Sequence, residues 1–204
     1  MGLGSIYGGG TLNRFIVIEG LDATGKSTLV ENLSNAISAV KLSCPPDVYL
    51  PSLTVNSART YFDTLNPLQR RAFYRFSNLV ASQEVTMHIA ESDVIMDRYW
   101  TSTAAFAAMD EGFANDIELG VYPEEILVPD LVILLTVDEE NRLKRLAGRG
   151  LKATNEELEL ARNMEKRKLV MERYMQFNPI VLDTSGKSPT EVCQEAIRVI
   201  EERL

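Results

Sequence analysis

Histidine, cysteine and tryptophan are scarce in this sequence of 204 residues, which contains one histidine, two cysteines and one tryptophan. A zinc centre needs three or four closely spaced Cys, His or acidic ligands, and Cys44, Cys193 and His88 are far apart in the chain. Two cysteines also provide no disulfide framework, so both are predicted to be small buried residues in a reducing compartment. The composition therefore argues against a zinc protein and against a disulfide-rich scaffold.

Long apolar segments and an excess of positive charge are also lacking. The longest run of Leu, Ile and Val covers residues 131–135, whereas a membrane span needs roughly 18 apolar residues. The formal net charge is −8, and Lys and Arg form no basic stripe of the kind that follows a nucleic-acid backbone. We therefore expect a soluble protein with neither a membrane nor a nucleic-acid polymer as partner, although local cations can still bind one nucleotide.

The length of the chain is typical of one domain with a substantial core. We predict a flexible lead-in over residues 1–13 and one domain over residues 14–204. The lead-in has neither the charge nor the apolar segment of a signal peptide. The expected location is the cytoplasm, or mitochondria if a transit segment has been removed.

Short apolar segments rich in β-branched residues alternate with longer amphipathic segments. In the amphipathic segments apolar residues recur at helical spacing, as at Leu29, Leu33 and Ile37. We predict strands over residues 14–19, 40–43, 94–97, 131–137 and 180–183, and helices over residues 27–38, 66–91, 102–110, 138–148, 155–177 and 189–204. Alternating strands and helices indicate an α/β fold, with a parallel sheet covered by helices on both faces.

A glycine-rich segment, GLDATGKST, covers residues 20–28 between the first predicted strand and the first predicted helix. It fits the P-loop pattern G-x-x-x-x-G-K-[ST] in the required strand–turn–helix context. Gly20 and Gly25 let backbone N–H groups turn toward phosphate oxygens, and the helix N-terminus adds its positive dipole. Lys26 is then expected to reach the β- and γ-phosphates of a nucleoside triphosphate, and Ser27 to bind Mg²⁺.

Asp97 and Arg98 follow the predicted strand VIM. A carboxylate at the end of a buried strand beside a P-loop can hold a water on Mg²⁺ or orient the acceptor. The planar guanidinium of Arg98 suits a phosphate group. No N-K-x-D guanine motif is present and the chain is short for an ATP-driven machine, so these features favour a kinase that acts on a small molecule.

Four segments in this order resemble the thymidylate kinase family: EGLDATGKST, DRYWTSTAAFA, PDLVILLTV and IVLDTSGKS. The resemblance extends from Arg14 over nearly the whole remaining chain. Within the family, RRAFYRFSN at residues 70–78 and the DRYW segment most resemble the mitochondrial-type UMP–CMP kinase branch. The resemblance implies a P-loop NTP hydrolase fold with a five-stranded parallel sheet and a short lid, and a kinase that uses ATP and Mg²⁺.

The resemblance also implies roles for individual residues. The ATP-binding set is Gly20, Ala23, Thr24, Gly25, Lys26, Ser27 and Thr28, with Thr184 beside the adenine. On the acceptor side, Asp22 would bind a sugar hydroxyl, Phe73 would stack on a pyrimidine and Arg98 would bind the phosphate. Phe106 would lie near the sugar, where it could sense a 2′-hydroxyl. Without the resemblance, Phe73 would be interpreted as a core residue of an amphipathic helix.

Two departures from the thymidylate kinase pattern bear on specificity. Thymidylate kinases usually have an arginine four residues after the stacking aromatic, where this chain has Ser77, followed by Asn78. The Asn78 amide can both donate and accept, which suits cytosine or uracil as well as thymine. The arginine after the second strand is also missing, and Arg59, Arg70 and Arg71 are alternative replacements. These departures argue against strict selectivity for thymine.

The cation that stabilises the transferring phosphoryl group is expected outside the P-loop, which contains no arginine. Arg145, Arg149 and Lys152 lie around the end of a charged helix, a suitable place for a lid. We assign Arg145 to ATP binding and Arg149 to catalysis. Asn155 stands where the UMP–CMP kinase branch tends to have a lid arginine.

The predicted reaction is transfer of the γ-phosphoryl group of ATP to UMP, CMP, dUMP or dCMP. Lys26, Asp97, Arg98 and Arg149 form the predicted catalytic set, and Ser27 and Asp97 the Mg²⁺ site. The alternatives are a kinase specific for dTMP, a kinase for a non-nucleotide acceptor and an ATP-binding regulator without phosphotransfer. The resemblance further implies a homodimer, for which the helix over residues 66–91 is a candidate surface.

Overall fold

The computed structural model describes residues 13–46, 55–107, 117–149, 160 and 163–204. Its strands are β1 (Phe15–Gly20), β2 (Val40–Ser43), β3 (Val94–Asp97), β4 (Leu131–Thr136) and β5 (Ile180–Asp183). They form one parallel sheet in the order β2-β3-β1-β4-β5. The predicted five-stranded parallel sheet is confirmed, and the bounds of β2, β3 and β5 agree with the sequence.

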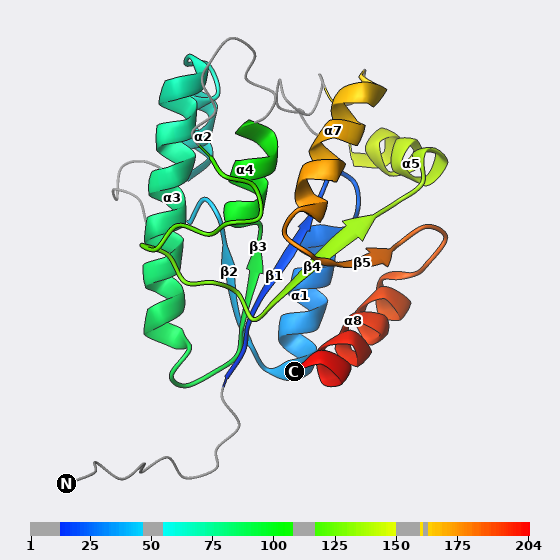
Figure 1. Ribbon diagram of the computed structural model, residues 1–204. Helices are drawn as coiled ribbons and strands as arrows, with labels where there is room; N and C mark the ends of the chain where they lie inside the picture. The colour runs from blue at the N-terminus through cyan, green and yellow to red at the C-terminus, as the bar shows by residue number, and fades with distance from the viewer. Residues whose placement is uncertain (1–12, 47–54, 108–116, 150–159, 161–162) are drawn as a thin grey trace, which may run out of the picture.

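Helices cover both faces of the sheet (Figure 1). Helices α1 (Lys26–Ile37) and α8 (Pro189–Arg203) pack on one face, and α3 (Pro67–His88) and α4 (Trp100–Ala107) on the other. Side chains of β1 alternate between these layers, because successive strand residues point to opposite faces. Ile16 and Ile18 join the first core, Phe15 and Val17 the second, and each such burial contributes roughly 1.5–3 kcal/mol.

The remaining helices lie near the carboxyl ends of the strands: α2 (Val55–Phe62), α5 (Glu139–Arg149) and α7 (Met164–Met175). Helix α2 was not predicted, because eight residues are too few for the helical spacing of Val55, Ala58 and Phe62 to stand out. The predicted helix over residues 155–177 is observed from Met164 onward. The proposed lid and most of the lead-in over residues 1–13 lie outside the described residues.

Two helix starts follow from local sequence. Asn66 caps α3 by accepting a hydrogen bond from the backbone N–H of Gln69, and a proline occupies the first turn, as predicted. Ser188 and Glu191 form a reciprocal capping box at the start of α8. Within the part of the chain that the structure describes, no helix is both long and apolar enough to cross a bilayer.

Candidate active site

The P-loop leaves β1 at its carboxyl end and turns sharply into α1. Gly20 has φ +142°, and a Cβ atom there would lie 2.6 Å from the Leu135 carbonyl oxygen of β4, so only glycine fits. Gly25 precedes α1 in a left-handed conformation, with φ 98°. No side chain caps α1, so its N-terminal amides are available to an anion.

Lys26 is the cation of this loop, and its ammonium group donates to the Leu21 carbonyl oxygen at 2.8 Å. The residue is only 7% exposed. Burial, followed by the nearby charge of Arg98, lowers the pKa of Lys26 to about 8. An ammonium group that has lost much of its hydration interacts more strongly with phosphate oxygens than a surface lysine does.

Arg145 of α5 joins the P-loop to the loop after β5. Its guanidinium donates to the Ala23 and Thr24 carbonyl oxygens, both at 3.2 Å, and to the Thr184 carbonyl oxygen at 2.7 Å. The Thr184 hydroxyl also donates to the Thr24 carbonyl at 3.0 Å. These groups line a hollow together with Gly25 and Thr28, so the structure brings together most of the residues predicted to bind ATP.

Ser27 and Asp97 are 70 residues apart in sequence and meet beside the P-loop. The Ser27 hydroxyl donates to Asp97 Oδ2 at 2.8 Å. Both provide hard oxygen ligands of the kind that Mg²⁺ prefers. The described residues contain no group of three or more His, Cys, Asp or Glu side chains that could hold a metal. A cation here would therefore depend on phosphate oxygens and water for its other ligands, as is usual for Mg²⁺.

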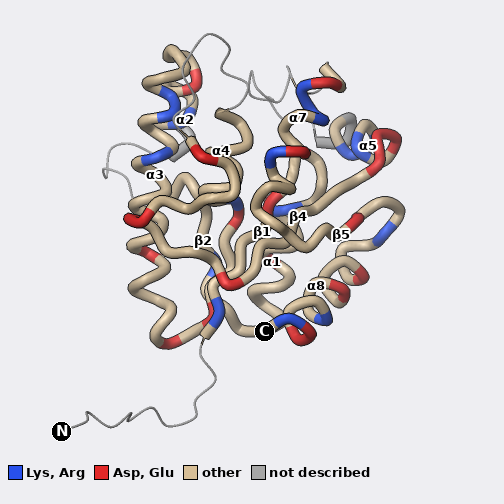
Figure 2. The backbone as a smooth tube through the Cα atoms, in the orientation of Figure 1, with Lys and Arg blue, Asp and Glu red and all other residues tan. Residues whose placement is uncertain are grey.

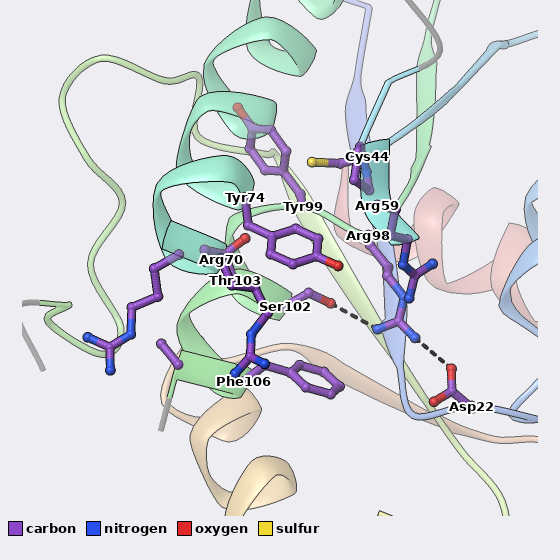
Figure 3. A pocket seen from close by; sticks show the side chains of 13 residues that line it. Asp22, Cys44, Arg59, Arg70, Tyr74, Arg98, Tyr99, Ser102, Thr103 and Phe106 are labelled. Carbon is purple, nitrogen blue, oxygen red and sulfur yellow. Dashed lines mark hydrogen bonds and ion pairs between the residues drawn. The ribbon is translucent and has the colours of Figure 1, made fainter. Parts of the chain in front are cut away.

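A pocket opens on the other side of Asp22, between α2, α3 and α4. Arg98 lines this pocket, and its guanidinium donates to Asp22 Oδ1 at 2.9 Å and to the Ser102 hydroxyl at 3.2 Å. It also lies 5.7 Å from the centre of the Phe106 ring, within the range of a cation–π contact. In Figure 3 these side chains and Tyr74 border one space, with dashed lines from Arg98 to Asp22 and Ser102.

The pocket is strongly cationic. Arg59, Arg70 and Arg71 line it together with Arg98. More generally, many Lys and Arg residues lie on α2, α3, α5 and α7, around the carboxyl ends of the strands (Figure 2). A chain with a net charge of −8 thus presents local positive charge at the pocket. This distribution attracts small anions without giving a long basic surface.

The structure does not bring two of the predicted acceptor-binding residues into this pocket. The Phe73 ring is buried against Phe62 of α2, with parallel rings whose centres lie 4.4 Å apart. The Asn78 amide donates to the Thr103 hydroxyl at 2.8 Å and to the Tyr74 carbonyl at 2.6 Å. Asn78 is 1% exposed and joins α3 to α4, so its base-reading role lacks a geometric basis.

Sequence reasoning missed Tyr74, Ser102 and Thr103 as pocket residues. Tyr74 follows Phe73 directly, so one helical step of about 100° decides which aromatic ring faces the cavity. The available signal was the i, i+4 spacing of Arg70 and Tyr74, which places both on one side of α3. The Tyr74 hydroxyl donates to Asp63 at 3.0 Å. The side chain of Arg149, assigned to catalysis, lies outside the described residues, as do Lys152 and Asn155.

Comparisons with known proteins agree with this geometry. The family model of thymidylate kinase matches residues 18–197. Human "UMP-CMP kinase 2, mitochondrial" is 37% identical over 198 residues, which cover 92% of this chain but 42% of that protein. The chain thus spans less than half of the human protein. A "probable thymidylate kinase" of Methanocaldococcus jannaschii is 30% identical over 194 residues, covering 91% of this chain and 94% of that protein.

Solved structures give the same fold. A thymidylate kinase from Candida albicans has a TM-score of 0.71 at 22% identity, covering 93% of this chain and 92% of that one. One from Ehrlichia chaffeensis has a TM-score of 0.58 at 18% identity, covering 92% and 98%. Together with the family match and the P-loop beside an arginine-lined pocket, these similarities show that the chain belongs to the thymidylate kinase family of P-loop nucleoside monophosphate kinases.

Proposed function

We propose that this kinase transfers the γ-phosphoryl group of ATP to a pyrimidine nucleoside monophosphate, with UMP, CMP, dUMP and dCMP as the main acceptors. The observation that carries this proposal is the position of Arg98 and Asp22 between the P-loop and the arginine-lined pocket. An acceptor phosphate bound at Arg98 would lie on the side of the P-loop where the γ-phosphate ends. Positioning and charge stabilisation supply most of the rate in this class of reaction.

The donor side of the reaction uses the P-loop. The α1 amides and Lys26 bind the ATP phosphates, while Arg145 and Thr184 border the nucleoside. Ser27 and Asp97 would hold Mg²⁺, which neutralises charge on the β- and γ-phosphates when it is bound. An acceptor phosphate oxygen then attacks the γ-phosphorus, the bond to the bridging oxygen breaks, and ADP leaves. Lys26 stabilises the charge that develops on the transferring group.

The acceptor side uses the cationic pocket. Arg98 binds the acceptor phosphate, and we assign the place of the missing arginine after β2 to Arg59, which lines the same pocket from α2. Asp22 accepts from a sugar hydroxyl once phosphate competes for its arginine partner. The sugar packs on Phe106, and Tyr74 takes over from Phe73 as the aromatic wall for the base, since the Tyr74 ring borders the cavity.

The test is an ADP-release assay with ATP and Mg²⁺ against UMP, CMP, dUMP, dCMP and dTMP. We expect kcat/KM to be highest for a uracil or cytosine nucleotide. Highest turnover with dTMP would instead establish the alternative, a thymidylate kinase proper, which the similarity to the Methanocaldococcus jannaschii protein favours. Absence of turnover with every nucleotide would reject both and favour a different acceptor or an ATP-binding regulator.

We also propose that the protein forms a homodimer through α3. Leu68, Phe76, Leu79 and Met87 are 44–66% exposed and lie on one side of the helix, within a sector of about 100°. In Figure 1 α3 lies at the edge of the molecule. An exposed apolar stripe of this length on a 22-residue helix is typical of an association surface.

Replacing Phe76 and Leu79 together with glutamate is expected to give a monomer, because each charge would be buried at the interface. Light scattering coupled to size exclusion measures this against the chain mass of 22.8 kDa. Leu204→Glu changes an equally exposed apolar residue away from α3 and should leave the dimer intact. A wild-type protein that elutes as a monomer would disprove this assembly.

A further inference from the structure

The carboxylate of Glu19 has no part in the reaction described so far. Glu19 lies in β1, directly before the P-loop, and is 0% exposed. Its Oε1 accepts from the backbone N–H of Tyr99 at 2.9 Å, from the backbone N–H of Ser102 at 3.2 Å and from the Thr101 hydroxyl. Its Oε2 accepts from the Ser102 hydroxyl at 2.6 Å. Every bond that these atoms accept comes from the four residues that follow Arg98.

The proton count at Ser102 ties this carboxylate to Arg98. A serine hydroxyl has one proton and two lone pairs. When Ser102 donates its proton to Glu19, it can only accept from its other partners, which are the Arg98 guanidinium at 3.2 Å and the Tyr174 hydroxyl at 2.7 Å. Burial raises the pKa of Glu19, and the hydrogen bonds that the carboxylate accepts oppose this shift. In its ionised form the carboxylate orients Ser102 so that the lone pairs of the hydroxyl face the guanidinium.

The backbone of Arg98 needs such support. Its φ is 65°, a left-handed conformation that costs a non-glycine residue about 1–2 kcal/mol. On one side, the Arg98 N–H donates to the Ile18 carbonyl oxygen of β1 at 3.1 Å. On the other side, the chain is held by the bonds to Glu19. Ile18 and Glu19, which accept these hydrogen bonds on either side, both belong to β1. The strand that leads into the P-loop therefore also sets the direction of the Arg98 side chain.

We propose that Glu19 is a positioning residue, which holds the turn after β3 so that Arg98 points at the acceptor phosphate. The proposal rests on the proposed function of Arg98. A carboxylate suits this role because its two oxygens accept four hydrogen bonds at once, whereas an amide side chain has a single acceptor oxygen. A purely structural role would need only volume and one or two bonds, and burying a charge for that purpose is costly.

Thr101 provides the cleanest test, because it bonds to Glu19 and is absent from the lining of the acceptor pocket. Thr101→Val keeps the shape and removes the hydroxyl donor, and Thr101→Ser restores it. We expect Thr101→Val to raise KM for the acceptor about threefold to tenfold. This is less than the roughly tenfold or more that the direct loss of one bond to a charged group would give, because the change reaches Arg98 only through Glu19. KM for ATP should change by less than about twofold, which corresponds to about 0.4 kcal/mol.

Glu19→Gln should have a larger effect in the same direction, with kcat/KM for the acceptor lowered about tenfold or more. Glu201→Gln, an exposed change at the end of α8, serves as the matched control and should behave as wild type. Near-ultraviolet circular dichroism checks that each variant is folded. If Glu19→Gln fails to fold, the comparison of Thr101→Val with Thr101→Ser still tests the proposal.

The outcomes distinguish a failure of the positioning role of Glu19 from a failure of the proposed function. A rise in acceptor KM alone, reversed by serine at position 101, supports the positioning role. Equal changes in the KM of ATP and of the acceptor, or wild-type kinetics in folded Thr101→Val and Glu19→Gln, would overturn it. Absence of turnover by the wild-type enzyme with any nucleoside monophosphate would reject the proposed function itself, before any variant is compared.

Discussion

Replacing Lys26 with alanine is expected to lower kcat by at least about a thousandfold, more than the loss of one neutral donor at a transition state. The ammonium group is the single cation of the P-loop and is 7% exposed. Water that fills the space would solvate the phosphates but would not carry the charge. The measurement is the same ADP-release assay, run at saturating ATP and acceptor so that weaker binding does not mask the effect on kcat.

Lys144→Ala is the matched control for this variant, because Lys144 projects from α5 and is paired only with Glu140 one turn away. Surface pairs of this kind contribute little to stability, and we expect wild-type activity. Circular dichroism should show that Lys26→Ala is folded, since the ammonium group donates its hydrogen bond to the Leu21 carbonyl of the same loop. If the folded variant kept the wild-type kcat, the proposed phosphotransfer at the P-loop would be wrong.

The second large effect is expected at Arg98. Arg98→Ala should lower kcat/KM for the acceptor about a hundredfold to a thousandfold, because a charged group that binds phosphate on two prongs is lost. Arg98→Lys should recover little of this loss, since an ammonium group cannot reproduce the planar fork that meets Asp22 and Ser102. Binding of ATP alone, followed by calorimetry, should change much less in both variants.

Arg198→Ala is the corresponding control, because Arg198 is exposed on α8, far from the pocket. It removes the same charge from the molecule, so it separates a local effect at the acceptor site from a change in overall charge. Equal losses of ATP and acceptor affinity in Arg98→Ala would argue against a site for the acceptor phosphate. Such a result would indicate instead that Arg98 holds the P-loop through Asp22.

The fold was largely predictable because its signals are local. Strands such as Val94–Asp97 are short buried segments between turns, and the N-terminus of α3 is encoded by Asn66 and the proline that follows. Helix α2 was missed because its eight residues are fewer than the roughly 11–18 over which a helical period is recognised, although Ala58 is buried. Its helical form depends on packing against α3, and a single sequence gives no direct information about that contact.

The donor and acceptor halves of the site also differ in how far local sequence determines them. The centre of the donor half is the P-loop, a continuous segment in which the spacing of Gly20, Gly25 and Lys26 determines the geometry. The acceptor half is assembled from α2, α3, α4 and the turn after β3, so its lining depends on helix rotation. This is why Phe73 was assigned to the acceptor pocket, which Tyr74 lines instead, and why Asn78 was assigned to the base although it is bonded to Thr103.

The left-handed backbone at Arg98 has a consequence for engineering this enzyme. A residue chosen for stability alone at φ 65° would be glycine or asparagine, since they adopt this conformation at the lowest cost. Glycine at this position should even be more stable than alanine, the reverse of the usual order. Selection for thermal stability without an activity screen would therefore favour a well-folded protein that no longer binds its acceptor, if Arg98 binds the acceptor phosphate as proposed, because that residue also costs stability.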